Sequence, residues 1–248
     1  RPVRFAFEPE KDKLAQARLL DAAFRAGYER VYFQYEPIAA AYSYAADLTQ
    51  PETILVFDFG GGTLDVTIMR LGDNLHQREI LATGGIPVAG DSFDRKLVRA
   101  KLPRHFGEGS YYRTDHKRMP VPGWIYDIFA DWQRILELQS PQNKLMLADI
   151  AAKAERPREI EALIGMVAEN YTLQMFDAVE HAKRELSDKM GALVKLDGPQ
   201  FHVRQLVTRT DFEAIIREDV LAVGAHLDEM LAQAGLTPAD IDVVVRTG

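Results

Sequence analysis

Short apolar runs near both ends of the chain predict a β-sheet. Residues 53–59 form a continuous apolar run, which is typical of a strand buried on both faces. Residues 63–71 alternate between apolar and polar positions, as expected for a second strand. A further apolar run covers residues 241–245 and predicts a last strand. These strands would lie in one sheet although they come from opposite ends of the sequence.

Other segments of the chain have apolar residues at helical spacing. Residues 11–26 place Leu14, Ala17, Leu20 and Phe24 on one side of an amphipathic helix, and we expect that side to be buried.

The following segments alternate in type. Residues 31–35 are a short β-rich run, and Pro37 then opens an alanine-rich helix over 38–46. Residues 91–106 also have a helical pattern.

The middle of the chain is mostly helical. A glycine- and tyrosine-containing loop over 107–123 leads into helical patterns from 124 to 189. Residues 193–196 and 201–207 predict a small pair of strands. The middle therefore looks like a helical insertion with a minor β part.

The predicted fold class is α/β, with a mixed sheet and a mostly helical second subdomain. We expect a core subdomain at 1–107 and 205–248, and the helical subdomain at 108–204. Thr210, with Glu213 three positions later, has the spacing of a capping box that would start the last long helix.

Composition narrows the class of protein. With 47% hydrophobic and 27% charged residues the chain is an ordinary globular one. Its net charge of −7 argues against general nucleic-acid binding. The absence of cysteine excludes disulfides and thiolate metal sites, and it is compatible with a cytoplasmic location. No apolar run approaches the roughly 20 residues that span a bilayer, so we expect no membrane partner.

One loop carries candidate chemistry. Gly60, Gly61, Gly62 and Thr63 lie between the strands 53–59 and 63–71. Three glycines allow positive φ and a close approach to a ligand, and successive N–H groups form an anion nest. The Thr63 hydroxyl can orient a water or touch a terminal phosphate. Asp58 and Asp65 flank the loop and suit Mg²⁺, usually through its waters.

Other interpretations of the loop are weaker. A plain hairpin needs only one or two glycines. No Lys-Ser or Lys-Thr follows, which excludes a Walker A loop, and a strand rather than a helix follows, which excludes a dinucleotide fingerprint. We therefore favour phosphate binding.

At this loop the chain resembles the actin-like ATPase superfamily, whose second phosphate motif is D-x-G-G-G-T. Three further segments are similar to the seventy-kilodalton, DnaK-like heat-shock chaperones: 36–42 resembles E-P-x-A-A-A, 89–94 resembles G-G-E-D-F-D, and 180–187 resembles E-x-A-K-R-x-L-S. Residues 102–170 depart from the ordinary chaperone and look like the divergent YegD-like branch.

The resemblance implies roles at the matching positions. Catalytic roles fall to Glu36, which would help to place the attacking water, to Thr63, and to Asp58, which would hold Mg²⁺ through water. Asp65 would be a supporting carboxylate. The positions implied to hold the phosphates of ATP or ADP are Gly60, Gly61, Gly62 and Thr63, with Gly90 on the phosphate or ribose side. Glu36 also has a simpler interpretation as a helix-start carboxylate near the dipole.

The resemblance also implies an adenosine pocket formed by Glu180, Lys183, Arg184 and Ser187, with Gly248 opening a second adenosine segment. The four positions follow i, i+3, i+4 and i+7 spacing and so share a helix face. Arg184 could stack on adenine, and its neighbours could bond the ribose. The alternative is a solvated stripe with a Glu180–Arg184 ion pair.

The resemblance implies that this chain is the second lobe of an Hsp70-like nucleotide-binding domain. The chain begins without Met and ends directly after a strand, so we expect a piece of a longer protein whose first-lobe phosphate loop lies elsewhere. The whole protein would hydrolyse ATP to drive binding and release of unfolded peptide clients, with co-chaperones as further partners. This piece alone would bind ATP weakly or not at all.

Two alternatives remain open. A sugar-kinase-type phosphotransferase would share the glycine loop but should lack the 36–42 and 180–187 segments. A non-enzymatic interaction module is disfavoured by the intact Asp58, Thr63 and Glu36.

Overall fold

The computed structural model describes residues 1–248 except 7, 46–47, 73–77 and 116. The chain forms two compact units. Unit 1 comprises Arg1–Ser92 and Glu218–Gly248, and unit 2 comprises Phe93–Arg217. Within the described residues, no helix combines the length and the apolar character needed to cross a membrane.

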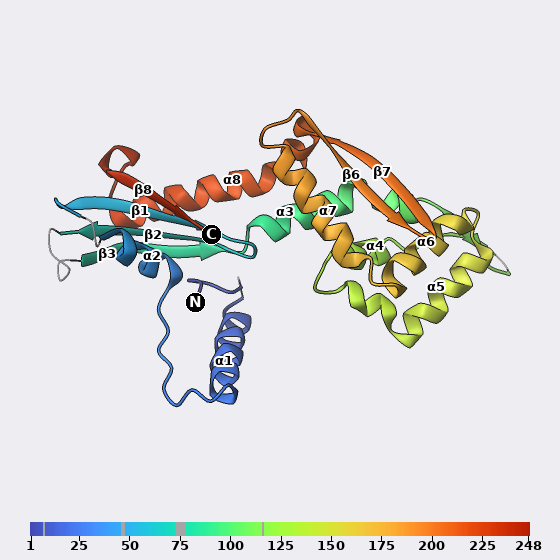
Figure 1. The fold of residues 1–248 in the computed structure, drawn as a ribbon, viewed down its shortest axis with the longest axis horizontal. Coiled ribbons are helices and arrows are strands. Elements are labelled where there is room, and N and C mark those ends of the chain that lie inside the picture. Colours follow the sequence, from blue (N-terminus) through green and yellow to red (C-terminus); the bar gives the residue numbers. More distant parts are fainter. Residues whose placement is uncertain (7, 46–47, 73–77, 116) are drawn as a thin grey trace. The chain divides into compact units, whose positions relative to one another are not determined.

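Unit 1 is built on a four-stranded mixed sheet with the order β3-β2-β1-β8. Strands β1 (Glu52–Phe59), β2 (Leu64–Leu71) and β3 (Arg78–Ile86) are antiparallel neighbours, while β8 (Val243–Thr247) runs parallel to β1. The parallel neighbour comes from the opposite end of the sequence, as the apolar runs predicted (Figure 1).

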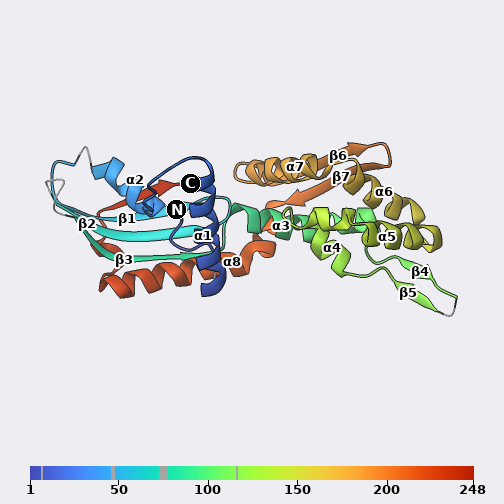
Figure 2. The same ribbon diagram turned by 90° about the horizontal axis from the view of Figure 1, so that it is seen from below.

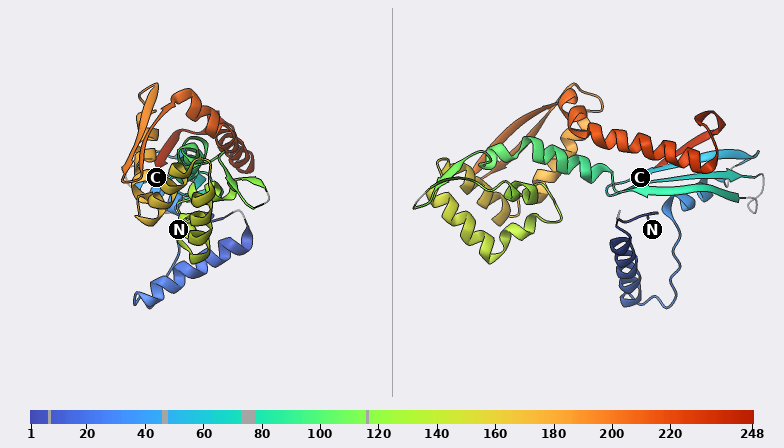
Figure 3. Two further views of the ribbon diagram at one scale, coloured as in Figure 1. Left: turned by 90° about the vertical axis from the view of Figure 1, so that its right-hand side faces the viewer. Right: turned by 180° about the vertical axis from the view of Figure 1, so that it is seen from behind.

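The sheet is covered on both faces, which explains why β1 reads as a continuous apolar run. Ile54 and Val56 pack with Ala41 of helix α2 (Glu36–Ala45) on one face. Leu55 lies in a second cluster with Met230 of helix α8 (Arg209–Ala234) on the other face. Figure 2 shows the sheet between α2 and α8, and the right panel of Figure 3 shows α8 running along the strands.

Helix α1 (Pro9–Arg25) forms where the pattern predicted it, but the expected burial is wrong, because none of its residues is buried. Leu14 and Phe24 are each 50% exposed. An amphipathic pattern identifies which face is apolar and says nothing of what covers that face. The expected strand at 31–35 is also wrong: the segment pairs with no strand in the described part of the chain.

Unit 2 contains most of the helices. Its elements are α3 (Gly90–Lys101, which begins in unit 1), η1 (Pro103–Phe106), β4 (Tyr111–Arg113), β5 (Arg118–Pro120), α4 (Trp124–Phe129), η2 (Ile135–Gln139), α5 (Pro141–Lys153), α6 (Pro157–Ala168), α7 (Thr172–Glu185), β6 (Gly191–Gly198) and β7 (Phe201–Thr208). The strand pair β6–β7 is confirmed, while the expected loop at 107–123 contains the short hairpin β4–β5.

The two units divide at other residues than the expected 108 and 204. Leu97, Val98 and Leu102 of the α3 region lie in the same apolar cluster as Val194 and Val207 of the hairpin β6–β7. Because packing of these side chains defines unit 2, it begins at Phe93 and extends to Arg217.

The start of α8 differs from the expected capping box. The Thr208 N–H donates to Asp211 Oδ2 at 3.3 Å, and the Asp211 N–H donates to Thr208 Oγ1 at 3.1 Å. This reciprocal pair has the same spacing as the predicted Thr210–Glu213 pair but lies two residues earlier, so it caps a helix that begins at Arg209.

A short η3 helix (Pro238–Asp240) connects α8 to β8. The Asp242 N–H donates to the Thr53 carbonyl at 2.9 Å, and Asp242 Oδ2 accepts from the Thr53 N–H at 2.8 Å. These bonds fix the start of β8 beside the start of β1, so both strands end beside the glycine loop.

Candidate functional site

The glycine loop joins β1 to β2 at the end of the sheet. Asp58 pairs with Asp65, and Phe59 with Leu64, so the hairpin closes around Gly60–Thr63. The Gly60 N–H donates to the Thr63 carbonyl at 3.2 Å. Among the described residues, the N–H groups of Gly61, Gly62 and Thr63 donate to no partner. Three backbone donors are therefore available at one turn, as an anion nest requires.

The carbonyl groups of the loop bond the start of α3. The Gly90 N–H donates to the Gly60 carbonyl at 3.2 Å, and the Asp91 N–H donates to the Gly61 carbonyl at 2.7 Å. These bonds orient the peptide planes of the loop while they use only carbonyl oxygens. The structure thus brings Gly90 to the loop.

The expected reason for the three glycines is wrong in part. Gly60, Gly61 and Gly62 do not have positive φ. A Cβ added at Gly60 or Gly62 would meet nothing within 4 Å, whereas one at Gly61 would lie 3.1 Å from Asp91 Oδ1. Neither backbone conformation nor internal packing therefore requires glycine at positions 60 and 62. Close approach of a ligand to the backbone is the remaining physical reason.

Asp65 is a buried carboxylate at the base of the loop, with only 1% exposure. It accepts hydrogen bonds from Thr63 Oγ1 at 3.2 Å and from the Val3 N–H at 3.0 Å. Burial raises the pKa of Asp65 to about 6, although the hydrogen bonds from Thr63, Val3 and Arg4 act in the opposite direction.

Gly85 is a residue that the sequence reasoning missed. It faces Asp65 across the β2–β3 pair, and a Cβ at Gly85 would overlap Asp65 Oδ1. Glycine at this position therefore leaves room for the buried carboxylate. The signal was present as a Gly84-Gly85 pair inside a β-rich run, where glycine often marks a close approach.

Three carboxylates influence one another at this end of unit 1. Burial, followed by the negative charge of Glu36, raises the pKa of Asp58. The charge of Asp58 in turn contributes to the raised pKa of Asp65. Within the described residues, no group of three or more such side chains could hold a metal ion directly.

Glu36 is the first residue of α2, so its carboxylate also lies at a helix start. It lies 3.9 Å from the backbone amine of Arg1. The structure thus supports the electrostatic link to Asp58 and leaves the simpler helix-start interpretation open.

Gly248 lies against the loop. Its φ is +112°, and a Cβ there would be 2.5 Å from the carbonyl of Phe59 and 2.9 Å from the Gly60 nitrogen. Beside it, a pocket of about 290 Å³ is lined by Phe57, Phe59, Arg246, Thr247 and Gly248. A guanidinium and two aromatic rings therefore lie near the glycine loop.

The predicted adenosine residues lie in unit 2. Glu180, Lys183 and Arg184 are on α7, but the helix ends at Glu185, so Ser187 is in the turn that follows. Arg184 Nη2 and Glu180 Oε1 form an ion pair at 2.6 Å, as the alternative interpretation expected. Lys183 Nζ lies 2.8 Å from Asp94 Oδ2. Two of the sequence motifs, 89–94 and 180–187, are therefore joined by an ion pair.

Comparison with known proteins identifies the family. The family model described as Hsp70 protein matches residues 12–118. The chaperone protein dnaK of Trieres chinensis is 30% identical over 237 residues, covering 92% of this chain and 30% of the relative. The chaperone protein DnaK of Thermotoga neapolitana is 29% identical over 237 residues, with 92% and 31% covered.

The chaperone protein dnaK3 of Synechocystis is 29% identical over 229 residues. The chain spans about 30% of the length of the first of these relatives and 24% of dnaK3. The similarity nevertheless extends over 92% of this chain, and the mixed sheet with its glycine loop agrees with it. The chain belongs to the Hsp70 family.

Proposed function

We propose that this chain is the part of an Hsp70-type nucleotide-binding domain that holds the phosphate groups of ATP or ADP. The observation that carries the proposal is the glycine loop: a Cβ at Gly60 or Gly62 would meet nothing within 4 Å, and the N–H groups of Gly61, Gly62 and Thr63 have no partner among the described residues. Backbone donors in such a turn bind phosphate oxygens. Gly90 and Gly248 lie beside the same loop and belong to the same site.

The carboxylates would act around the phosphates. Asp58 would hold the waters of a bound Mg²⁺, which supplies positive charge to the phosphate groups. Glu36 and the Thr63 hydroxyl would position the attacking water, and Asp65 would hold the Thr63 hydroxyl by the hydrogen bond described above. Burial raises the pKa values of Asp58 and Asp65 in the chain alone, and a nearby cation would favour their charged forms.

The adenosine end would be held by Glu180, Lys183, Arg184 and Ser187. In this structure Lys183 is paired with Asp94 and Arg184 with Glu180, so a nucleoside would share or replace these partners. The Lys183–Asp94 pair is mostly buried, whereas the Arg184 side chain is largely exposed.

For the whole protein, we propose an ATP-driven chaperone of the cytoplasm that binds unfolded peptides and works with co-chaperones. The YegD-like branch is the proposed subfamily, because residues 102–170 depart from the pattern of the ordinary chaperone. Closure of two lobes around the nucleotide would couple hydrolysis to peptide binding.

The test is single-turnover ATP hydrolysis in a longer protein that carries this chain together with the complementary lobe. We expect Thr63→Val and Glu36→Gln each to slow hydrolysis by about 100-fold, the usual scale for a residue that positions a nucleophile. The matched control is Thr49→Val, at an exposed position outside the site. Unchanged hydrolysis in both site variants would contradict the proposal.

A further inference from the structure

The carboxylate of Asp91 lies against the glycine loop and has no role in the function proposed above. A Cβ added at Gly61 would be 3.1 Å from Asp91 Oδ1 and 3.7 Å from Asp91 Oδ2. The Asp91 N–H donates to the Gly61 carbonyl at 2.7 Å, and the Gly90 N–H donates to the Gly60 carbonyl at 3.2 Å. These two bonds hold the start of α3 against the loop, and they keep the Asp91 carboxylate beside Gly61.

The carboxylate lies close to the free donors of the loop. Because a Cβ is about 1.5 Å from its Cα, Asp91 Oδ1 lies within about 5 Å of the Gly61 Cα. The backbone nitrogens of Gly61 and Gly62 are each within about 2.5 Å of that Cα. The Asp91 charge is therefore within about 7 Å of both donor nitrogens, a distance over which salt screens it only in part.

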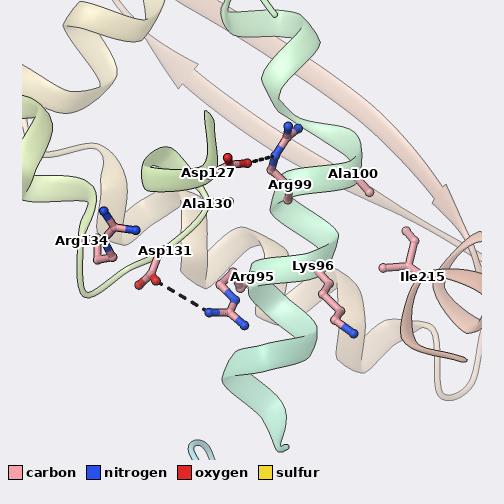
Figure 4. A pocket seen from close by; sticks show the side chains of 9 residues that line it. All are labelled: Arg95, Lys96, Arg99, Ala100, Asp127, Ala130, Asp131, Arg134 and Ile215. Carbon is pink, nitrogen blue, oxygen red and sulfur yellow. Dashed lines mark hydrogen bonds and ion pairs between the residues drawn. The ribbon is translucent and has the colours of Figure 1, made fainter. Parts of the chain in front are cut away.

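Asp91 differs from the other charged side chains of α3, because no partner neutralises it. Arg99 Nε donates to Asp127 Oδ1 at 2.7 Å, and Arg95 Nη1 lies 3.8 Å from Asp131 Oδ2 (Figure 4). The remaining charged side chains of this helix also interact with neighbours, namely Asp94, Lys96 and Lys101. Within the described residues, the Asp91 carboxylate accepts no hydrogen bond and forms no ion pair. Its charge is therefore available to act on a ligand of the loop.

The other charged groups named at the loop leave Asp91 unpaired. Asp58 and Asp65 lie opposite one another in the β1–β2 pair, before and after the loop, and they add negative charge. Arg246 lines the pocket beside Gly248, but in the described part of the chain it forms no ion pair with Asp91. An anion at the loop N–H groups would therefore be attracted by the donors and repelled by Asp91.

A simpler role for Asp91 is electrostatic support of the helix start. Asp91 lies in the first turn of α3, where a carboxylate interacts favourably with the helix N-terminus. Ser92 already supplies a side-chain acceptor there, because its Oγ accepts from the Ala89 N–H at 3.3 Å. Support of the helix start predicts an effect on stability alone, whereas a charge beside the loop predicts an effect on the affinity for anions.

We propose that Asp91 discriminates between nucleotides by charge: its carboxylate disfavours a bare diphosphate at the loop and so favours a nucleotide that carries a divalent cation. This inference rests on the phosphate role proposed for the loop. Binding of Mg²⁺ offsets two of the negative charges of ADP, so the repulsion by Asp91 is smaller for Mg-ADP than for ADP. Repulsion directed at one of two related ligands is a general source of specificity.

The experiment is a titration of the isotopically labelled chain with ADP in the presence of a chelator, and separately with Mg-ADP, at matched ionic strength. The amide NMR signals of Gly61, Gly62 and Thr63 report binding at the loop. We expect Mg-ADP to bind at least about tenfold more tightly than metal-free ADP.

Asp91→Asn removes the charge at nearly constant volume. It should tighten the binding of metal-free ADP by about tenfold, because a repulsion between charges about 7 Å apart is removed. The binding of Mg-ADP should change by less than about threefold, since the complex carries less negative charge. A role limited to the helix start would instead change the urea-denaturation midpoint and leave both dissociation constants as they are in the parent.

The control is Asp228→Asn, at an exposed position on α8, which removes the same charge from the same unit and should bind both ligands as the parent does. The inference is overturned if the parent and Asp91→Asn bind metal-free ADP equally tightly while Mg-ADP still shifts the loop amides. No shift by either ligand, in the parent and in Asp91→Asn, would overturn the phosphate role of the loop and this inference with it.

Discussion

Lys183 Nζ lies 2.8 Å from Asp94 Oδ2, and the two side chains are only 17% and 13% exposed. Removing one member of such a pair leaves the other charge with poor solvation. We expect Lys183→Met to lower the free energy of unfolding by about 3 kcal/mol. The double variant Lys183→Met/Asp94→Leu should lower the free energy of unfolding clearly less than Lys183→Met does.

Urea denaturation of the two single variants and the double variant gives the coupling energy. A coupling energy near zero would show that Lys183 and Asp94 do not depend on each other. The exposed Glu180–Arg184 pair is the matched comparison, and its coupling should be below about 0.5 kcal/mol.

A second prediction concerns the pH dependence of stability. The pKa of Asp65 is about 6 in the folded chain, above its ordinary value of 3.8. The folded state therefore holds the proton more tightly than the unfolded state. The resulting stabilisation is complete below pH 4 and is lost as the pH rises through about 6, with a total change of about 3 kcal/mol.

Asp65→Asn should abolish this loss, so that the variant gains stability relative to the parent as the pH rises from 4 to 7. Chemical denaturation at several pH values measures the effect. Asp188→Asn, at an exposed aspartate, is the control and should keep the parent's profile. A profile for Asp65→Asn that parallels the parent's would refute the assignment.

The Thr63 hydroxyl should lower the pKa of Asp65 directly. Its hydroxyl donates to Asp65 Oδ2 at 3.2 Å, and this bond lowers the pKa of that carboxyl. Thr63→Val removes the donor at nearly constant volume and should raise the pKa of Asp65 further. Thr63→Ser keeps the hydroxyl and should leave that pKa close to the parent's. Carboxyl NMR titration of Asp65 distinguishes the two outcomes, and equal pKa values in both variants would contradict the role given to the hydroxyl.

The glycines should separate into two classes. Gly62→Ala places a Cβ where nothing lies within 4 Å, so stability should change by less than about 0.5 kcal/mol. Gly85→Ala places a Cβ into the Asp65 carboxylate and should cost about 1–3 kcal/mol. Thermal or urea unfolding measures both variants. Similar losses in both would mean that Gly62 is needed for the fold.

The sequence predicted the strands and the loop because those signals are local. The continuous apolar run at β1 required cover on both faces, and α2 and α8 provide it. The alternation over residues 63–71 predicted a strand but not the burial of Asp65, which is only 1% exposed.

Other features depend on packing that a single sequence does not show. The exposure of α1 depends on what its apolar face meets, and the boundary at Phe93 depends on where Leu97 and Val98 pack. Positive φ was expected at Gly60–Gly62 because glycine permits it, but an open path to the backbone explains two of these glycines instead. The cap at α8 was misplaced because Thr208–Asp211 and Thr210–Glu213 have the same spacing.

The central claim is that the backbone N–H groups of Gly61, Gly62 and Thr63 bind phosphate oxygens of a nucleotide. The most direct measurement is a titration of the labelled chain with Mg-ADP, observed at these three amides. The account predicts saturable shifts with a dissociation constant of the order of 1 mM, because the chain supplies only part of the phosphate contacts. It also predicts that Gly62→Val, which fills the open path, removes those shifts. Amides that stay unmoved in the parent, or that move equally in Gly62→Val, would contradict it.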